Sequence, residues 1–120
     1  MRRHTAGLLT LTLTAALTLT GCSSEDADKE PTGKGTTIAV TIADGAVTPN
    51  GERIEVERGA PITFAITSDV EGEMHVHSTP EHSIAYGVGE TEKTITLEQA
   101  KVVEVELHDP AMTVVQLEVR

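Results

Sequence analysis

From residue 36 onward, the chain consists of short runs in which an apolar residue stands at every second position. A period of two places these side chains on one face of an extended strand, whereas a helix needs a period near 3.6. Turn-forming residues interrupt the runs at Asp44-Gly45, at 49–51 and at 58–61. The runs are therefore predicted to be β-strands with one face in the core, and their clearest inward positions are Ile38, Val40, Ile42, Ile54, Val56, Ile62, Phe64 and Ile66.

The same pattern continues towards the C-terminus. No amphipathic helix of ordinary length is indicated, and the only helical element expected is a single turn at 96–100. Seven or eight short strands at regular spacing predict an all-β domain over residues 36–120, an antiparallel-dominated β-sandwich. The further strands are expected at 73–78, 82–86, 92–97, 101–107 and 113–119.

Composition excludes several classes of binding site. Aromatic residues make up only 2% of the chain, as Phe64 and Tyr86, so the core must be built from Val, Ile, Leu and Ala. This scarcity argues against an aromatic-lined site for bases, sugars or ring cofactors. The formal net charge is −10. Nucleic acid is therefore not an expected partner, because phosphate binding requires a basic face.

The N-terminal part of the chain has the pattern of a targeting segment. Residues 1–21 begin with a basic Arg2-Arg3 pair and continue as an uncharged, leucine-rich run, which predicts a signal peptide. The run ends in Leu19-Thr20-Gly21-Cys22, which resembles the lipobox of bacterial lipoproteins. The resemblance implies that Cys22 is lipidated and anchors the protein to the cell membrane on its extracytoplasmic face. The alternative is a chance cysteine at the end of an ordinary leader.

Residues 22–35 form a polar stretch with no apolar residue larger than alanine, apart from the cysteine that starts it. Such a stretch is typical of a disordered tether. Cys22 is the only cysteine in the chain, and it precedes the predicted domain. The domain therefore has no intramolecular disulfide and no thiolate to serve as a nucleophile or metal ligand.

The order of elements within the domain resembles a known family. Residues 46–69 place a proline-containing loop before a strand, a glycine turn and an apolar strand. A histidine-bearing strand follows at Met74-His75-Val76-His77, and His108 and Met112 stand just before the last strand. This succession resembles the cupredoxin-like domains, in particular the small cupredoxin-like lipoproteins of bacteria, and implies a Greek-key β-sandwich.

In blue-copper members of that family, a mid-domain His and a Cys, a His and usually a Met near the last loop hold the metal. The resemblance implies that His75 or His77 takes the first position, His108 the second histidine and Met112 the methionine. The cysteine is absent, because the positions three to five residues before His108 hold Val103, Glu104 and Val105. Without a thiolate, a blue-copper electron-transfer site cannot form.

A site of another kind stays open. Imidazoles alone or with carboxylates suit Cu(II) or Zn(II), and a thioether from Met112 or Met74 would favour Cu(I). The alternative follows from strand parity. If Met74 and Val76 face the core, then His75 and His77 share the outer face with Glu73, and the histidines are simply solvated.

The sequence therefore supports two functional hypotheses. The first is a membrane-anchored, extracytoplasmic cupredoxin-like lipoprotein that binds or hands over copper through His75, His77, His108 and Met112. The second is a β-sandwich without metal that serves as an interaction or envelope-associated module. No serine elbow, phosphate-cradling glycine loop or helical His-Glu pattern is present, so no enzymatic activity is expected.

Overall fold

The computed structural model describes residues 32–120, and within that range it contains nine β-strands and no helix. None of the described residues therefore forms a helix long and apolar enough to span a membrane. The all-β prediction is confirmed. In chain order the strands are β1 (Thr36–Ala43), β2 (Ala46–Thr48), β3 (Glu52–Val56), β4 (Ile62–Ser68), β5 (Gly72–Val76), β6 (His82–Tyr86), β7 (Gly89–Ile95), β8 (Val102–His108) and β9 (Ala111–Val119).

The strand that the sequence pattern did not predict is β2, which has only three residues. It pairs with β1 in a hairpin whose turn is Asp44-Gly45. Both turn residues have positive φ, at 54° and 73°, as a two-residue hairpin of type I′ requires. The prediction of a helical turn at 96–100 was wrong, since this segment has no helical residue. Leu97 in it is 3% exposed and belongs to the core.

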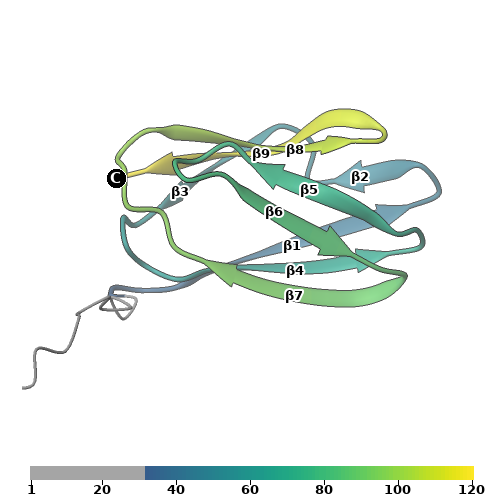
Figure 1. Cartoon of the computed structure of the whole chain (residues 1–120), viewed down its shortest axis with the longest axis horizontal. Helices are drawn as coiled ribbons and strands as arrows, with labels where there is room; N and C mark the ends of the chain where they lie inside the picture. Colours follow the sequence, from purple (N-terminus) through teal and green to yellow (C-terminus); the bar gives the residue numbers. More distant parts are fainter. Residues whose placement is uncertain (1–31) are drawn as a thin grey trace, which may run out of the picture.

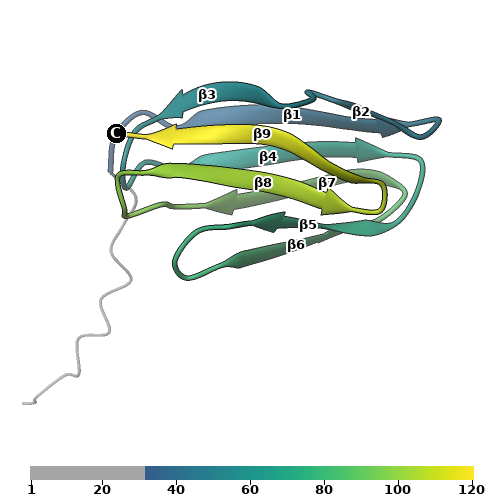
Figure 2. The ribbon, with the colours of Figure 1, turned by 90° about the horizontal axis from the view of Figure 1, so that it is seen from above.

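The strands form two sheets, which Figure 1 shows stacked as layers. One sheet has four strands in the order β2-β1-β4-β7, and the other has five in the order β3-β9-β8-β5-β6. Figure 2 looks onto the five-stranded sheet. Most neighbouring strands are antiparallel, but β1 pairs in parallel with β4, and β3 with β9. The sheets are therefore mixed, with antiparallel pairs in the majority.

The core lies between the sheets and is made almost entirely of aliphatic side chains. Alternate residues along the strands point into it, so β1 has the burial pattern that a period of two predicts. Phe64 and Tyr86 are its only aromatic members, and Phe64 is fully buried. All eight inward positions expected from the sequence lie in or against this core, Ile54 being only partly buried.

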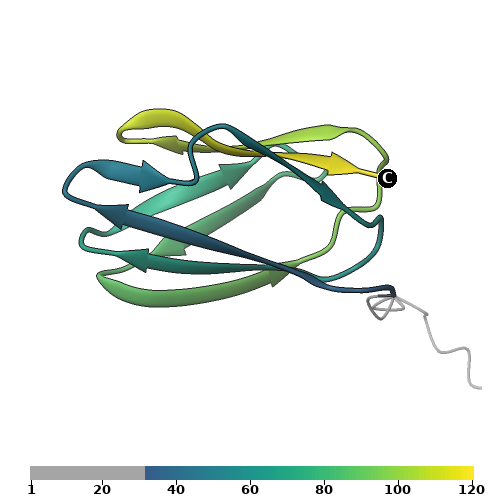
Figure 3. The ribbon, with the colours of Figure 1, turned by 180° about the vertical axis from the view of Figure 1, so that it is seen from behind.

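The two ends of the sandwich differ in what they hold. The C-terminus and the start of β1 lie at one end, as Figures 1 and 3 show. There Thr32 donates a backbone hydrogen bond to Gly59, and Thr36 donates one to Pro61. The β1–β2, β4–β5, β6–β7 and β8–β9 turns lie at the other end (Figure 2). The chain therefore enters the sandwich far from the turn that follows His108.

Candidate functional site

Strand parity places His75 of β5, and His77 directly after this strand, on the outer face of the five-stranded sheet. Met74 and Val76 are fully buried in the core. The side chains of His75 and His77 point the other way, and they are 24% and 40% exposed. Glu73 lies on the same outer face, two residues before His75.

The neighbouring strand β8 has the same alternation. Val103, Val105 and Leu107 face the core, which leaves His108 on the outer side. The pairing of Met74 with Leu107 brings the end of β8 next to the start of β5. As a result the rings of His75 and His108 meet edge to face, with centroids 4.5 Å apart and an interplanar angle of 86°. Two histidines 33 positions apart in the sequence are therefore direct neighbours.

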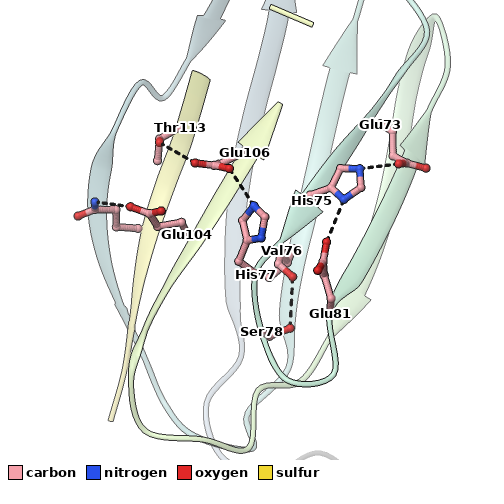
Figure 4. A network of polar contacts seen from close by, with 10 residues as sticks. Glu73, His75, Val76, His77, Ser78, Glu81, Glu104, Glu106 and Thr113 are labelled. Atoms are coloured by element: carbon pink, nitrogen blue, oxygen red, sulfur yellow. Dashed lines mark hydrogen bonds and ion pairs between the residues drawn. The ribbon is translucent and has the colours of Figure 1, made fainter. Parts of the chain in front are cut away.

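Both ring nitrogens of His75 contact carboxylates (Figure 4). Its Nε2 lies 2.6 Å from Oε1 of Glu73, and its Nδ1 lies 3.1 Å from Oε1 of Glu81. A neutral imidazole can donate only one hydrogen bond, whereas an imidazolium can donate to both carboxylates. The hydrogen bond to Glu81 is the main reason that the pKa of His75 is raised above 6.5; partial desolvation opposes this shift, and the contacts with Glu73 add to it. This arrangement favours the protonated ring.

The pKa of Glu73 is shifted in the opposite direction. A hydrogen bond with Ser83 is the main reason that the pKa of Glu73 lies below its ordinary value of 4.5, and the contacts with His75 add to the effect. The charge of His108 also contributes by Coulombic attraction. Ser83 stands directly opposite His75 on β6. Glu73 is therefore held as a carboxylate beside both rings.

His77 belongs to a separate group of contacts. Its Nε2 lies 2.8 Å from Oε2 of Glu106 (Figure 4). Thr113 on β9 donates a longer hydrogen bond of 3.5 Å to the other oxygen of Glu106. The structure thus brings His77 to β8 and β9, while it pairs His75 with His108.

Neither methionine of the domain lies on the histidine face. Met112 is paired with Leu107 across the β8–β9 hairpin, and directly opposed residues share one face of a sheet. Because Leu107 is buried in the core, Met112 lies on the core side, where it packs against the cluster of buried residues. Met74 is also on that side and is fully buried. Both thioethers are therefore separated from the imidazoles by the sheet.

A cavity of about 570 Å³ opens at the end of the sandwich that carries the β1–β2, β4–β5 and β8–β9 turns. His75, His108 and Glu73 line it together with Asp69, Asp109 and the apolar Val70. Glu81, on the other side of the His75 ring, is not part of its lining. The lining of the cavity is therefore acidic, and both imidazoles form part of it.

The fourth histidine of residues 32–120 does not join this site. His82 is paired with Val76, which faces the core, so it does not join the outer histidines. Cys22 and the predicted signal peptide lie outside the described residues. Within residues 32–120, no group of three or more His, Cys, Asp or Glu side chains is arranged to hold a metal ion. The described donors thus form a pair of imidazoles with flanking carboxylates.

Glu81 and Ser83 were not singled out from the sequence. Both act on this site because β5 and β6 form a hairpin in which His75 lies opposite Ser83. The Thr79-Pro80 pair between two strand-like runs indicated a turn there. Counting the hairpin register from that turn would have placed Glu81 and Ser83 beside His75.

Comparison with known proteins identifies the fold. No family model matches the chain, and no curated protein matches its sequence. Among solved structures, a reduced tryptophan-to-tyrosine mutant of amicyanin is similar, with 13% identity, a TM-score of 0.53, and coverage of 70% of this chain and 82% of that one. A methionine-to-alanine mutant of amicyanin in its Cu(I) form has 15% identity, a TM-score of 0.52, and coverage of 74% and 86%. The domain therefore has the cupredoxin-like Greek-key fold, as the sequence resemblance predicted.

Proposed function

We propose that this protein is a membrane-anchored, extracytoplasmic lipoprotein whose cupredoxin-like domain binds copper, to hold it or hand it over. The observation that carries the proposal is the contact between His75 and His108 at the wall of the acidic cavity. The amicyanin structures with a similar fold are of a protein that holds copper. Two imidazoles on one surface are a donor pair that copper favours.

The donor set fits a copper site other than the blue-copper type. Imidazole nitrogen and carboxylate oxygen are available at His75, His108 and Glu73. The described residues contain no cysteine, so no thiolate can supply the bond that blue-copper electron transfer requires. Bound at these donors, copper would be an exchangeable ion, which is the property that holding or handing over requires.

The position of the cavity agrees with a lipid anchor at Cys22. The described chain enters the sandwich at the end opposite the β4–β5 and β8–β9 turns (Figures 1 and 2). A tether that starts at the membrane would therefore leave the cavity pointing outward, where a metal donor or acceptor could reach it. Dual acylation at an N-terminal cysteine would give stable attachment, which a single acyl chain does not.

Calorimetric titration of a soluble form of residues 23–120 with Cu(II) tests the metal site. We expect one ion per chain with micromolar or tighter affinity. The double variant His75→Ala/His108→Ala should weaken binding by more than the roughly 10–100-fold that loss of an outer partner costs. His82→Ala is the matched control, because it removes an imidazole that lies away from the cavity. Affinity no better than millimolar, or equal in the double variant, would refute copper binding at this site.

The anchor requires its own experiment. Cys22→Ala should release the full-length protein from the membrane fraction, because the acyl groups have no other predicted attachment point. A Ser23→Ala variant, which leaves the cysteine in place, should stay with the membrane. Retention of the Cys22→Ala protein would contradict lipidation.

A second function is favoured by one specific observation. Both nitrogens of His75 are already bonded to carboxylates, as in a surface group that serves only structure. In that case the domain is an interaction or envelope-associated module without metal. The same titration decides between the two, since this module would bind Cu(II) no better than the double variant does.

A further inference from the structure

We infer that the copper site is made of nitrogen and oxygen donors, with the carboxylate of Glu73 completing the His75–His108 pair, so that it takes Cu(II) in preference to Cu(I). This inference rests on the function proposed above. It adds the third ligand, the ligating nitrogen of His75 and the oxidation state of the ion.

Glu73 is the carboxylate best placed to be the third donor. Its Oε1 lies 2.6 Å from Nε2 of His75. Donor atoms that bind one ion at about 2.0–2.2 Å each lie roughly 3 Å apart. Exchange of the shared proton for a metal ion therefore requires only a small movement of this pair. His108 contacts the same His75 ring edge to face. Because no three described His, Cys, Asp or Glu side chains converge on one ion in the present arrangement, the inferred site forms only when the His108 ring turns from this contact toward the Glu73–His75 pair.

The cavity distinguishes the two carboxylates that flank His75. Glu73 lines the cavity together with both imidazoles, whereas Glu81 does not. Glu81 lies 3.1 Å from Nδ1, on the other side of the ring. A carboxylate that accepts a hydrogen bond from one imidazole nitrogen fixes the ring and leaves the other nitrogen free to bind metal. Glu81 is therefore a positioning residue, and Nε2 is the metal-binding nitrogen.

Sulfur is excluded from this set of donors by the sheet itself. Met112 lies on the core side of the hairpin, opposite the buried Leu107. Met74 is fully buried on the same side. Cu(I) prefers soft thiolate and thioether ligands, whereas imidazole and carboxylate suit Cu(II). A site without sulfur should therefore favour the oxidised ion.

Parallel titrations with the two copper ions test the inference. The soluble form of residues 23–120 would be titrated with Cu(II) by calorimetry, and with Cu(I) under reducing conditions against a colorimetric chelator. We expect tighter binding of Cu(II), and an electron paramagnetic resonance spectrum with nitrogen and oxygen ligation. Glu73→Gln should weaken Cu(II) binding by roughly tenfold or more and change that spectrum.

Two further variants provide controls. Met112→Leu conserves volume on the core side and should leave both affinities unchanged. Glu81→Gln should change the Cu(II) spectrum less than Glu73→Gln does, because it keeps a hydrogen-bond acceptor near Nδ1. Circular dichroism would confirm that each variant is folded, as expected for Glu73 and Glu81, whose side chains are about half exposed.

The outcomes separate this inference from the proposed function. Copper binding that is tighter for Cu(I), weakened by Met112→Leu or unaffected by Glu73→Gln would overturn the donor assignment and leave copper binding standing. Failure to bind either ion would overturn both.

Discussion

On the outer face of the four-stranded sheet, β1 and β4 place only threonine and alanine, whereas the outer face of the five-stranded sheet is crowded with ionisable groups. Thr37, Ala39 and Thr41 of β1 lie beside Thr63, Ala65 and Thr67 of β4 in a parallel register. The corresponding outer positions are Glu73 and His75 of β5, His77 directly after it, and Val102, Glu104, Glu106 and His108 of β8.

Both faces come from the same alternation and cover the same core, so folding alone does not explain the difference. Threonine is what an exposed strand position favours for local reasons, because its branched side chain suits the pleated backbone. Histidines and carboxylates have no such preference. Histidines and carboxylates gather on β5 and β8 beside the cavity, where the proposed copper site would lie. On the other sheet the edge strand β7 carries Glu90 and Glu92, and the outer positions of β1 and β4, called the threonine face below, provide an internal control.

The largest effect is expected from placing an aspartate at an inner position of a strand, and the matched control places it at the neighbouring outer position. Val40 is 1% exposed and faces the core, whereas its neighbour Ala39 faces solvent. Val40→Asp buries an unpaired carboxylate at a cost of several kcal/mol, which is comparable to the whole stability of a small domain. Ala39→Asp should cost less than about 1 kcal/mol. Thermal unfolding followed by circular dichroism would show no cooperative transition for the first variant and a near-normal one for the second.

Equal damage from both substitutions would break the comparison, because it would mean that the threonine face is covered in the folded protein. A normal transition for Val40→Asp would contradict the assignment of β1 to the core.

The sequence could predict the features that depend on neighbouring residues, but not those that depend on contacts between distant segments. The inner and outer positions of β1, β4, β5 and β8 were predictable because parity is a local property of the chain. The short β2 was not, since three residues show no clear alternation. The parallel pairings of β1 with β4 and β3 with β9 depend on contacts between distant segments, for which a single sequence carries no signal.

The candidate site shows the same limit. Parity correctly placed His75, His77 and His108 on an outer face. That His108 reaches His75 depends on the pairing of Met74 with Leu107, which joins strands far apart in the chain. The lack of a cysteine in the domain could be read directly, but the separation of Met112 from the histidines required the register of the β8–β9 hairpin.

A second prediction concerns the pH dependence of stability, which should differ between the faces. The folded-state pKa of His75 is raised, mainly by Glu81, so the protonated ring stabilises the folded state. This contribution is complete below the unfolded pKa near 6.5 and is lost as pH rises through the higher folded value. Urea unfolding from about pH 5 to about pH 9 should therefore show a loss of stability in wild type that His75→Gln lacks.

The control for this prediction lies on the threonine face. Thr41→Ala should follow the wild-type pH profile, because no titrating group is removed. Proton-detected NMR titration would place the pKa of His75 above 6.5 in the wild type and lower it in Glu81→Gln. A His75 that titrates at or below its ordinary value would refute the role of Glu81.

The smallest effects are expected from two matched cross-strand pairs, one on each face. Thr63 and Thr94 share a hydroxyl hydrogen bond of 2.8 Å between β4 and β7. His77, directly after β5, and Glu106 of β8 form a contact of the same length. Double-mutant cycles with Thr63→Val and Thr94→Val, and with His77→Ala and Glu106→Gln, should each give a coupling of about 0.2–1 kcal/mol.

Salt separates the two pairs even though their sizes are similar. The His77–Glu106 pair involves the charge of the glutamate carboxylate, and the two side chains are 40% and 32% exposed, so ions can screen it. At about 1 M salt the screening length falls to roughly 3 Å, and the coupling between His77 and Glu106 should decrease. The coupling between Thr63 and Thr94, which involves no charge, should be unchanged. If salt changed the two coupling free energies equally, charge would not distinguish the His77–Glu106 pair from the Thr63–Thr94 pair. The contrast between the two faces would then be one of composition alone.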